Sequence, residues 1–173
     1  MRKIFFFLLI LSAMFFSAAA EAKEQIAFSH LTDDFWQIWV MDPDGKNKYQ
    51  VTISEFDKRD PAWLRNGKQL AFRTSNGELF LVNLDGSDEH EILKQYNSIN
   101  NPAFSHKTDD IVFVRFDPRG KDMGDIWKSS LDGKSSKLLT NDALGKFQPN
   151  FSSQADKITF VKADPDRKNY IFG

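Results

Sequence analysis

A three-part motif recurs along the chain after its first twenty-two residues, and this repeat limits the possible folds more than any other feature. The Pro-x-aromatic part occurs at Pro61-Ala62-Trp63, Pro102-Ala103-Phe104 and Pro149-Asn150-Phe151, at separations of 41 and 47 residues. The other two parts recur at the same separations: Ile38-Trp39, Leu79-Phe80 and Ile126-Trp127, and Asp44-Gly45, Asp85-Gly86 and Asp132-Gly133. A period of about 40 residues predicts a repeat architecture.

Within this repeat, three intervals are constant and one varies. The proline and the phenylalanine of the next apolar run are 11 residues apart, the Ile-Trp-like aromatic and the Asp-Gly glycine are 6 apart, and that glycine and the next proline are 16 apart. The step from the phenylalanine to the following aromatic is 11, 8 or 14 residues. One variable interval predicts a single tolerant surface loop in each unit.

Each unit is predicted to contain four short strands. The Pro-x-aromatic string would form the innermost strand, with proline as its first residue, where the ladder needs no N–H donor. Apolar runs at 69–73, 111–115 and 157–162 predict second strands, and 78–83 and 125–129 predict third strands that end at an Asp-Gly turn. More polar runs at 48–52, 90–93 and 137–140 suit an exposed fourth strand. Four-stranded units of this length are typical of propeller blades.

The predicted fold class is therefore all-β: a partial β-propeller of four-stranded antiparallel blades, preceded by a signal peptide helix. The strand count is fourteen, which makes about three and a half blades, whereas closed propellers have about four to eight. We expect a truncated reading frame or fragment. The alternatives are a self-closing four-bladed ring and a homo-oligomer in which a second chain completes the ring.

The first 22 residues are predicted to be a signal peptide. Arg2 and Lys3 precede thirteen apolar residues from Ile4 to Phe16, and Ala20 and Ala22 offer small side chains to a signal peptidase. Thirteen residues are short of the roughly 20 that a membrane-spanning helix needs. Residues 23–173 would then be the exported domain, with no stable membrane insertion after cleavage.

Composition excludes several classes of function for the exported domain. The chain has no cysteine, so disulfide scaffolds, thiolate metal sites and cysteine nucleophiles are ruled out. Without residues 1–22 it has 21 basic and 23 acidic residues, a formal charge of −2. That balance gives no sign of a nucleic-acid or anionic-membrane surface.

The repeat resembles a known family. The strings at 61–72 (PAWLRNGKQLAF) and 38–47 (IWVMDPDGKN) are similar to the TolB-type propeller repeat, and the resemblance covers almost the whole of residues 23–173. The turns at 105–110 and 152–157 depart from it, because they lack the usual Pro-Asp-Gly-Lys. By resemblance, the chain would be a periplasmic module that binds envelope proteins, such as a peptidoglycan-associated lipoprotein, in a Tol-Pal-type system of cell-envelope integrity.

No catalytic, metal or cofactor site is predicted. His30 and His106 lie in similar strings but in different parts of the repeat, so they would emerge on opposite faces of a blade. The loop that begins at Asp42 has Asn47 and Ile53 where a calcium loop needs glycine and glutamate, so a tight turn explains it. A serine hydrolase would need a Gly-x-Ser-x-Gly elbow, which the sequence lacks.

Candidate binding residues come from the variable loop. In a propeller, the loops between second and third strands share a face with the connections between blades, and partners of repeat proteins dock on such variable faces. The candidates are Trp36 in the first unit and Asp117, Arg119, Lys121 and Asp122 in the longest loop.

The sequence thus predicts a non-catalytic, periplasmic protein-binding module. The main alternative is a truncated or accessory propeller domain of an exported hydrolase or glycan-degrading enzyme. A third possibility is a decayed gene product without a stable fold.

Overall fold

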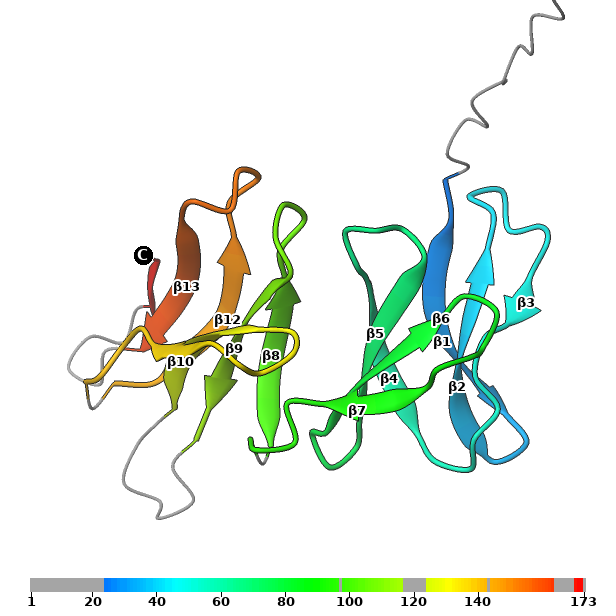
Figure 1. Cartoon of the computed structure of the whole chain (residues 1–173), viewed down its shortest axis with the longest axis horizontal. Helices are drawn as coiled ribbons and strands as arrows, with labels where there is room; N and C mark the ends of the chain where they lie inside the picture. Colours follow the sequence, from blue (N-terminus) through cyan, green and yellow to red (C-terminus); the bar gives the residue numbers. More distant parts are fainter. Residues whose placement is uncertain (1–23, 97, 117–123, 143, 164–169, 173) are drawn as a thin grey trace, which may run out of the picture.

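The computed structural model describes residues 24–96, 98–116, 124–142, 144–163 and 170–172, which form fourteen strands in four antiparallel sheets (Figure 1). The first sheet contains β1 (Ile26–Thr32), β2 (Phe35–Met41) and β3 (Tyr49–Gln50). The second contains β4 (Lys58–Trp63), β5 (Gln69–Thr74), β6 (Leu79–Asn83) and β7 (His90–Ile92). The third contains β8 (Ile99–Phe104), β9 (Asp110–Arg115), β10 (Asp125–Ser130) and β11 (Ser136–Leu138). The fourth contains β12 (Lys146–Phe151), β13 (Ile158–Ala163) and β14 (Tyr170–Phe172).

These sheets, called blades 1 to 4 below, confirm the all-β class and the predicted strand order. Within every sheet, neighbours in sequence are neighbours in space, so each blade is a simple meander. No helix in the described part of the chain has the length and apolar character to cross a membrane. The signal peptide predicted for residues 1–22 lies outside the described residues.

The first strand of blades 2, 3 and 4 corrects one prediction. Each begins three residues before the proline instead of at it. The residue before the proline has a left-handed φ, 55° at Asp60, 46° at Asn101 and 50° at Gln148, and the pairing register shifts at this point in all three strands. A β-bulge leaves a residue outside the ladder. The proline is therefore tolerated inside the strand, because its missing N–H lies where the pairing is interrupted.

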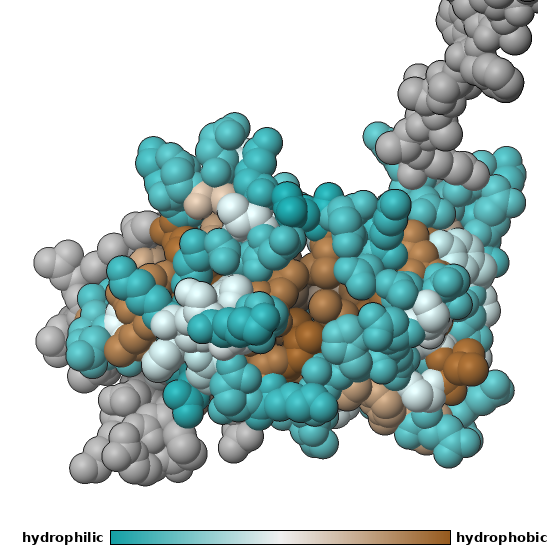
Figure 2. Space-filling model, viewed as in Figure 1, coloured by the Kyte–Doolittle hydropathy of each residue, from teal (hydrophilic) through white to brown (hydrophobic). Residues whose placement is uncertain are grey.

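Two apolar clusters hold the blades together. One joins Ile38 and Val40 of blade 1 to Leu70, Phe72 and Val82 of blade 2. The other joins blade 2 to blade 3 through residues of β5, β6, β8 and β9, including Leu79, Leu81, Ile99, Ile111 and Phe113. Figure 2 shows apolar side chains gathered where the second and third sheets meet. The motif aromatics lie where neighbouring blades meet: Trp63 packs on the first cluster, Phe104 belongs to the second, and Lys128 of blade 3 lies over the Phe151 ring.

The loops form two rims. The turn rim contains the first-to-second strand turns, of which those after β8 and β12 lie along the upper edge of Figure 1. The connection rim contains the second-to-third strand loops together with the segments that link one blade to the next. This is the arrangement that sequence reasoning expected for the variable face.

The segments that link the blades differ in polarity. At the third residue before the motif proline, blades 2 and 4 have Lys58 and Lys146, which are fully buried, whereas blade 3 has the buried Ile99. Six residues earlier in each unit, Thr52 and Thr140 accompany the lysines and Leu93 accompanies Ile99. The segments that lead into blades 2 and 4 therefore carry a buried lysine, whereas the segment that leads into blade 3 is apolar.

Candidate functional site

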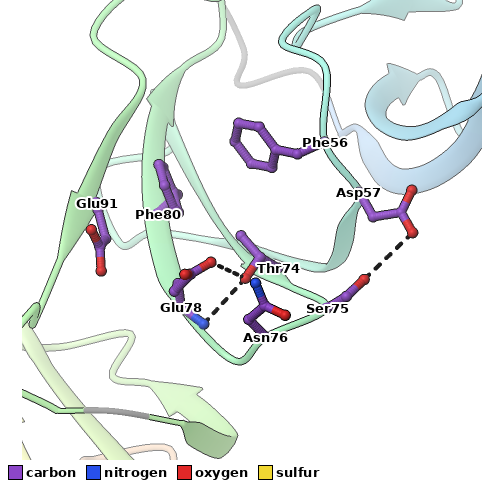
Figure 3. Close-up of a pocket in the computed structure, with 8 residues that line it drawn as sticks. All are labelled: Phe56, Asp57, Thr74, Ser75, Asn76, Glu78, Phe80 and Glu91. Carbon is purple, nitrogen blue, oxygen red and sulfur yellow. Dashed lines mark hydrogen bonds between the residues drawn. The ribbon is translucent and has the colours of Figure 1, made fainter.

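A recess of about 200 Å³ opens on the connection rim where blades 1 and 2 meet (Figure 3). Two aromatic rings, three carboxylates and three small polar side chains line it. They come from the link between the blades, the end of β5, the β5–β6 loop, β6 and β7. The lining residues are Phe56, Asp57, Thr74, Ser75, Asn76, Glu78, Phe80 and Glu91. The recess thus has an apolar wall and an acidic mouth, without a basic side chain among its lining residues.

The aromatic wall is part of the packing between the blades. The Phe80 ring stacks on Phe72 with centroids 5.5 Å apart, and Phe56 contacts Phe80 at 5.4 Å. Lys58 approaches Phe56 to 3.8 Å from the ring centroid, while its ammonium donates hydrogen bonds to the carbonyls of Ser54 and Phe56. Burial lowers the pKa of Lys58, and the charges of Glu89 and Asp57 oppose that shift.

The small size of Thr74 leaves the recess open. Thr74 follows Phe72 by two residues, and the same position in blade 3 is Arg115, two residues after Phe113. Arg115 places its guanidinium over Tyr96 and Trp127, with its Cζ atom 5.4 and 5.6 Å from the ring centroids. A long side chain therefore fills at the second junction the space that is vacant at the first.

Glu78 reaches the recess because its neighbourhood departs from the repeat. The equivalent residues in blades 1 and 3, Gln37 and Asp125, each accept a hydrogen bond from a threonine hydroxyl, Thr52 and Thr140. In blade 2 the threonine position is Leu93. Glu78 is exposed and instead accepts a hydrogen bond from Thr74, with Oγ1 and Oε2 2.6 Å apart, as Figure 3 shows.

Asp57 closes the other side of the recess. Its Oδ1 atom accepts a hydrogen bond from the backbone N–H of Trp36 at 3.0 Å, and its Oδ2 atom lies 3.4 Å from the Ser75 hydroxyl and 3.5 Å from Arg59. The hydrogen bond from Trp36 is the main reason why the pKa of Asp57 is below its ordinary value. Asp57 therefore remains a carboxylate at neutral pH.

The structure places Trp36 beside the recess without making it a lining residue. The prediction that Trp36 lies in the variable loop was wrong: Trp36 is half-buried in β2, where it pairs with Leu31 of β1. Its ring lies under the guanidinium of Arg59, 4.7 Å from Cζ, and its backbone holds Asp57. The other four candidates, Asp117, Arg119, Lys121 and Asp122, lie outside the described residues.

Sequence reasoning missed Phe56, Glu78 and Glu91. The signal that could have found them is departure from the repeat: Glu91 occupies the position of Gln50 in blade 1 and Leu138 in blade 3. Comparison of aligned positions for side-chain size and charge would have marked 74, 91 and 93, the last of which frees Glu78 from the threonine hydroxyl that its equivalents bind.

The histidines and the Asp42 loop occupy ordinary structural positions. His30 lies within β1 with its ring edge-on to Trp39, and His106 is exposed in the β8–β9 turn. Asp42 begins a hairpin turn, because its carbonyl accepts the Gly45 N–H and its side chain accepts from Asn47. Among the residues that the structure describes, no group of three histidines or carboxylates could hold a metal ion.

A second cavity, of about 410 Å³, lies on the turn rim between blades 2 and 3. Arg65 and Asp109 line it and form a bidentate ion pair, with N–O distances of 2.7 and 3.3 Å. This pair joins the first-to-second strand turns of two neighbouring blades. The charged side chains of this cavity already neutralise each other in the ion pair, so the acidic recess is the better candidate for a binding site.

Comparison with known proteins bears on the fold. No protein-family model matches the chain, and no curated protein gives a significant match. A protein assigned as TolB from Agrobacterium tumefaciens is 21% identical with a TM-score of 0.68, and the match covers 84% of this chain and 52% of that one. TolB from Acinetobacter baumannii is 16% identical with a TM-score of 0.64, over 86% of this chain and 38% of that one.

Enzymes share the architecture as well. The tricorn protease is 17% identical with a TM-score of 0.62, over 86% of this chain and 16% of that one. An oligogalacturonate lyase in complex with manganese is 13% identical with a TM-score of 0.62, over 82% of this chain and 43% of that one.

Together the blades and these similarities define the chain as a partial β-propeller. Within that class its fold is TolB-like. The chain spans about half the length of the Agrobacterium protein and less of the others.

Proposed function

We propose that this chain is a non-catalytic protein-binding module whose partner docks on the connection rim. The observation that carries the proposal is the recess between blades 1 and 2, where aromatic rings and carboxylates share one opening. Such a combination of apolar wall and few polar groups is typical of binding sites. The other candidate contact, Trp36, lies next to it.

The proposal extends to place and partner. The N-terminal sequence resembles an export signal, and the repeat resembles TolB, so the module would act in the periplasm. Its partner would be an envelope protein, with a peptidoglycan-associated lipoprotein as the first candidate, in a Tol-Pal-type system. The fold and the acidic recess are compatible with this role.

A capture experiment tests the proposal. The purified chain is immobilised and exposed to envelope extract, and retained proteins are identified by mass spectrometry. We expect a lipoprotein to be retained by the native chain and lost with Glu91→Arg, which reverses a charge in the recess. The matched control is Asp156→Arg, which makes the same charge change in an exposed turn on the turn rim. Equal retention by all three proteins would contradict the proposal.

A second candidate function is a propeller domain of an exported hydrolase or glycan-degrading enzyme. The similarity to the lyase and the protease favours it, because part of each of those proteins has a similar structure. Equilibrium binding of the purified chain to oligogalacturonate and to unfolded peptides separates the two functions, because an accessory domain would bind the substrate of its enzyme without cleaving it. Binding of either substrate, together with no retained envelope protein, would replace the first proposal with this one.

A further inference from the structure

The junction between blades 2 and 3 shows what an occupied recess looks like. There Tyr96 contacts Phe113 and Trp127, with centroids 5.2 and 5.9 Å apart, and the Arg115 guanidinium covers Tyr96 and Trp127. A guanidinium over an aromatic face is attracted by the negative charge of the ring face. This chain therefore already contains one arginine seated against an aromatic pair on the connection rim.

The junction between blades 1 and 2 has the same aromatic frame without the arginine. Phe72 and Phe80 correspond to Phe113 and Trp127, and Phe56 takes the place of Tyr96 in the contact with the third-strand aromatic. Thr74 stands where Arg115 would be. The aromatic residues are therefore present at this junction, but the arginine that would pack on them is absent. The space left beside the rings could accept a guanidinium group from another molecule.

The charges around the vacant place favour a cation. Asp57, Glu78 and Glu91 line it, whereas the corresponding positions of the next junction are Ser98, Asp125 and Leu138. Asp125 already accepts hydrogen bonds from the Thr140 hydroxyl and the Lys146 ammonium. Lys58 is buried and directed to backbone carbonyls. The cations that reach these carboxylates are on exposed side chains, Arg59 at 3.5 Å from Asp57 and Lys94 at 3.9 Å from Glu91. Exposed ion pairs of this kind contribute little free energy, so a guanidinium from a ligand can replace them.

We propose that this recess receives an arginine side chain of the partner protein. Arginine fits better than lysine because its planar guanidinium stacks on a ring while its forked N–H groups donate to carboxylates. In the bound state the guanidinium would occupy the space that Arg115 fills one junction later, against Phe80 and within reach of Glu78 and Glu91. The inference rests on the proposed function and specifies the chemistry of its partner.

A titration followed by ¹⁵N–¹H NMR tests the recognition step without the partner. The probe is N-acetyl-arginine amide, and the control is N-acetyl-citrulline amide, which has the same shape without the charge. We expect shifts at the amides of Ser75, Asn76, Phe80 and Glu91, and binding of the citrulline compound at least about tenfold weaker. Equal binding of the two compounds, or shifts confined to other residues, would overturn the inference.

Two variants locate the effect. In Thr74→Arg the new side chain should occupy the recess as Arg115 does at the next junction, so this variant should not bind the arginine probe. Thr108→Arg, a matched change in the exposed β8–β9 turn on the other rim, should leave it intact. Glu91→Gln should weaken binding several-fold without adding bulk, and it serves as the measurement if Thr74→Arg does not fold. Unchanged binding in Glu91→Gln and Thr74→Arg would overturn the inference.

The capture experiment separates this inference from the function on which it rests. If Thr74→Arg still retains the envelope partner while losing the arginine probe, the binding module stands and the arginine contact is refuted. If Thr74→Arg loses both, the contact is supported. If the native chain binds the probe but retains no partner, the recess chemistry holds and the proposed function fails.

Discussion

Two lysine side chains, Lys58 and Lys146, are fully buried, whereas the other lysines in the described part of the chain lie nearer to the surface. The Lys146 ammonium is 2.9 Å from Asp125 Oδ1, 2.8 Å from Asp142 Oδ1 and 2.6 Å from the Asp142 carbonyl. Burial acts to lower the pKa of Lys146, but the hydrogen bonds to Asp142 and Asp125 outweigh it, and the pKa is raised. Lys146 is therefore a charged group inside a junction, held there by its partners.

Removing that charge should be costly. Lys146→Met leaves Asp125 buried without its cation, and such a loss typically lowers the free energy of unfolding by about 3 kcal/mol or more. Urea denaturation of Lys146→Met measures it, with the exposed Lys134→Met as the matched control. Combining Lys146→Ile with Asp125→Leu should recover most of the loss, because no unpaired charge remains. A free energy of unfolding for Lys146→Met within about 0.5 kcal/mol of the native value would contradict this account.

Asp142 should make stability depend on pH in the acid range. Hydrogen bonds from Lys146 and Lys162 hold its pKa well below the ordinary 3.8. As the pH falls below about 4, the unfolded chain takes up a proton at this carboxyl and the folded chain does not, so the free energy of unfolding decreases. The stability advantage of the native chain over Asp142→Asn should therefore shrink between about pH 5 and pH 2. A constant difference across that range, measured by urea denaturation, would be inconsistent with the ion pairs.

At the level of elements, the Asp-Gly turns serve more than one purpose. Gly45 and Gly86 have φ values of 78° and 81°, in the left-handed region that favours glycine. A Cβ atom on Gly45 would meet nothing within 4 Å, whereas one on Gly86 would lie 2.7 Å from the Val51 carbonyl oxygen of the preceding blade. The second turn is therefore also a contact between blades 1 and 2.

This difference gives a matched pair of substitutions. Gly45→Ala should cost only the backbone strain of a left-handed residue, about 1 kcal/mol. Gly86→Ala should cost at least about 1 kcal/mol more, because the new methyl group must push the two blades apart. Thermal and urea denaturation of both variants compare them, and equal losses would show that the close approach has no energetic consequence.

The strands were predictable because their signals are local. Constant intervals around Pro61, Trp39 and Gly45 gave the order of the strands and the polar character of the outer ones. The bulge was missed, because its strand starts at positions as different as Lys58 and Ile99. Asp60 and Asn101 are residue types that tolerate a left-handed φ, but Gln148 at the third equivalent position is not, so the signal does not recur with the repeat. Trp36 was chosen because it was expected to lie in the variable loop, but it lies within β2, because the β1–β2 turn is shorter than the interval in the sequence suggested.

The recess itself could not be predicted from local patterns. It exists because Thr74 is short where Arg115 is long, and because Leu93 replaces a threonine that would have engaged Glu78. Both facts concern which side chain fills a space between two blades. Alignment of the repeats marks the unusual positions, but only the packing of the blades shows that they surround one recess.

For the whole molecule, stability should come mainly from contacts between blades. Phe113 is fully buried between blades 2 and 3, whereas Phe28, its equivalent in blade 1, is only partly buried and lies near His30. Phe113→Ala should lower the free energy of unfolding by about 3 to 5 kcal/mol, and Phe28→Ala by less than about 2 kcal/mol. Urea denaturation of both variants tests this, and a comparable loss at Phe28 would indicate that its face is covered in solution.

The change in polarity from one junction to the next has a consequence for how such a molecule assembles. Identical repeats could pair in any order, and a blade could take the place of its neighbour during folding. Here, a blade whose linking segment carries Lys146 requires Asp125 across the boundary, whereas one that carries Ile99 requires Leu79 and Leu93. Exchanging the two linking segments would bury the Lys146 ammonium among leucine side chains without a carboxylate partner. We expect a chain with its third and fourth units transposed to fail to fold, because each boundary accepts only its own neighbour.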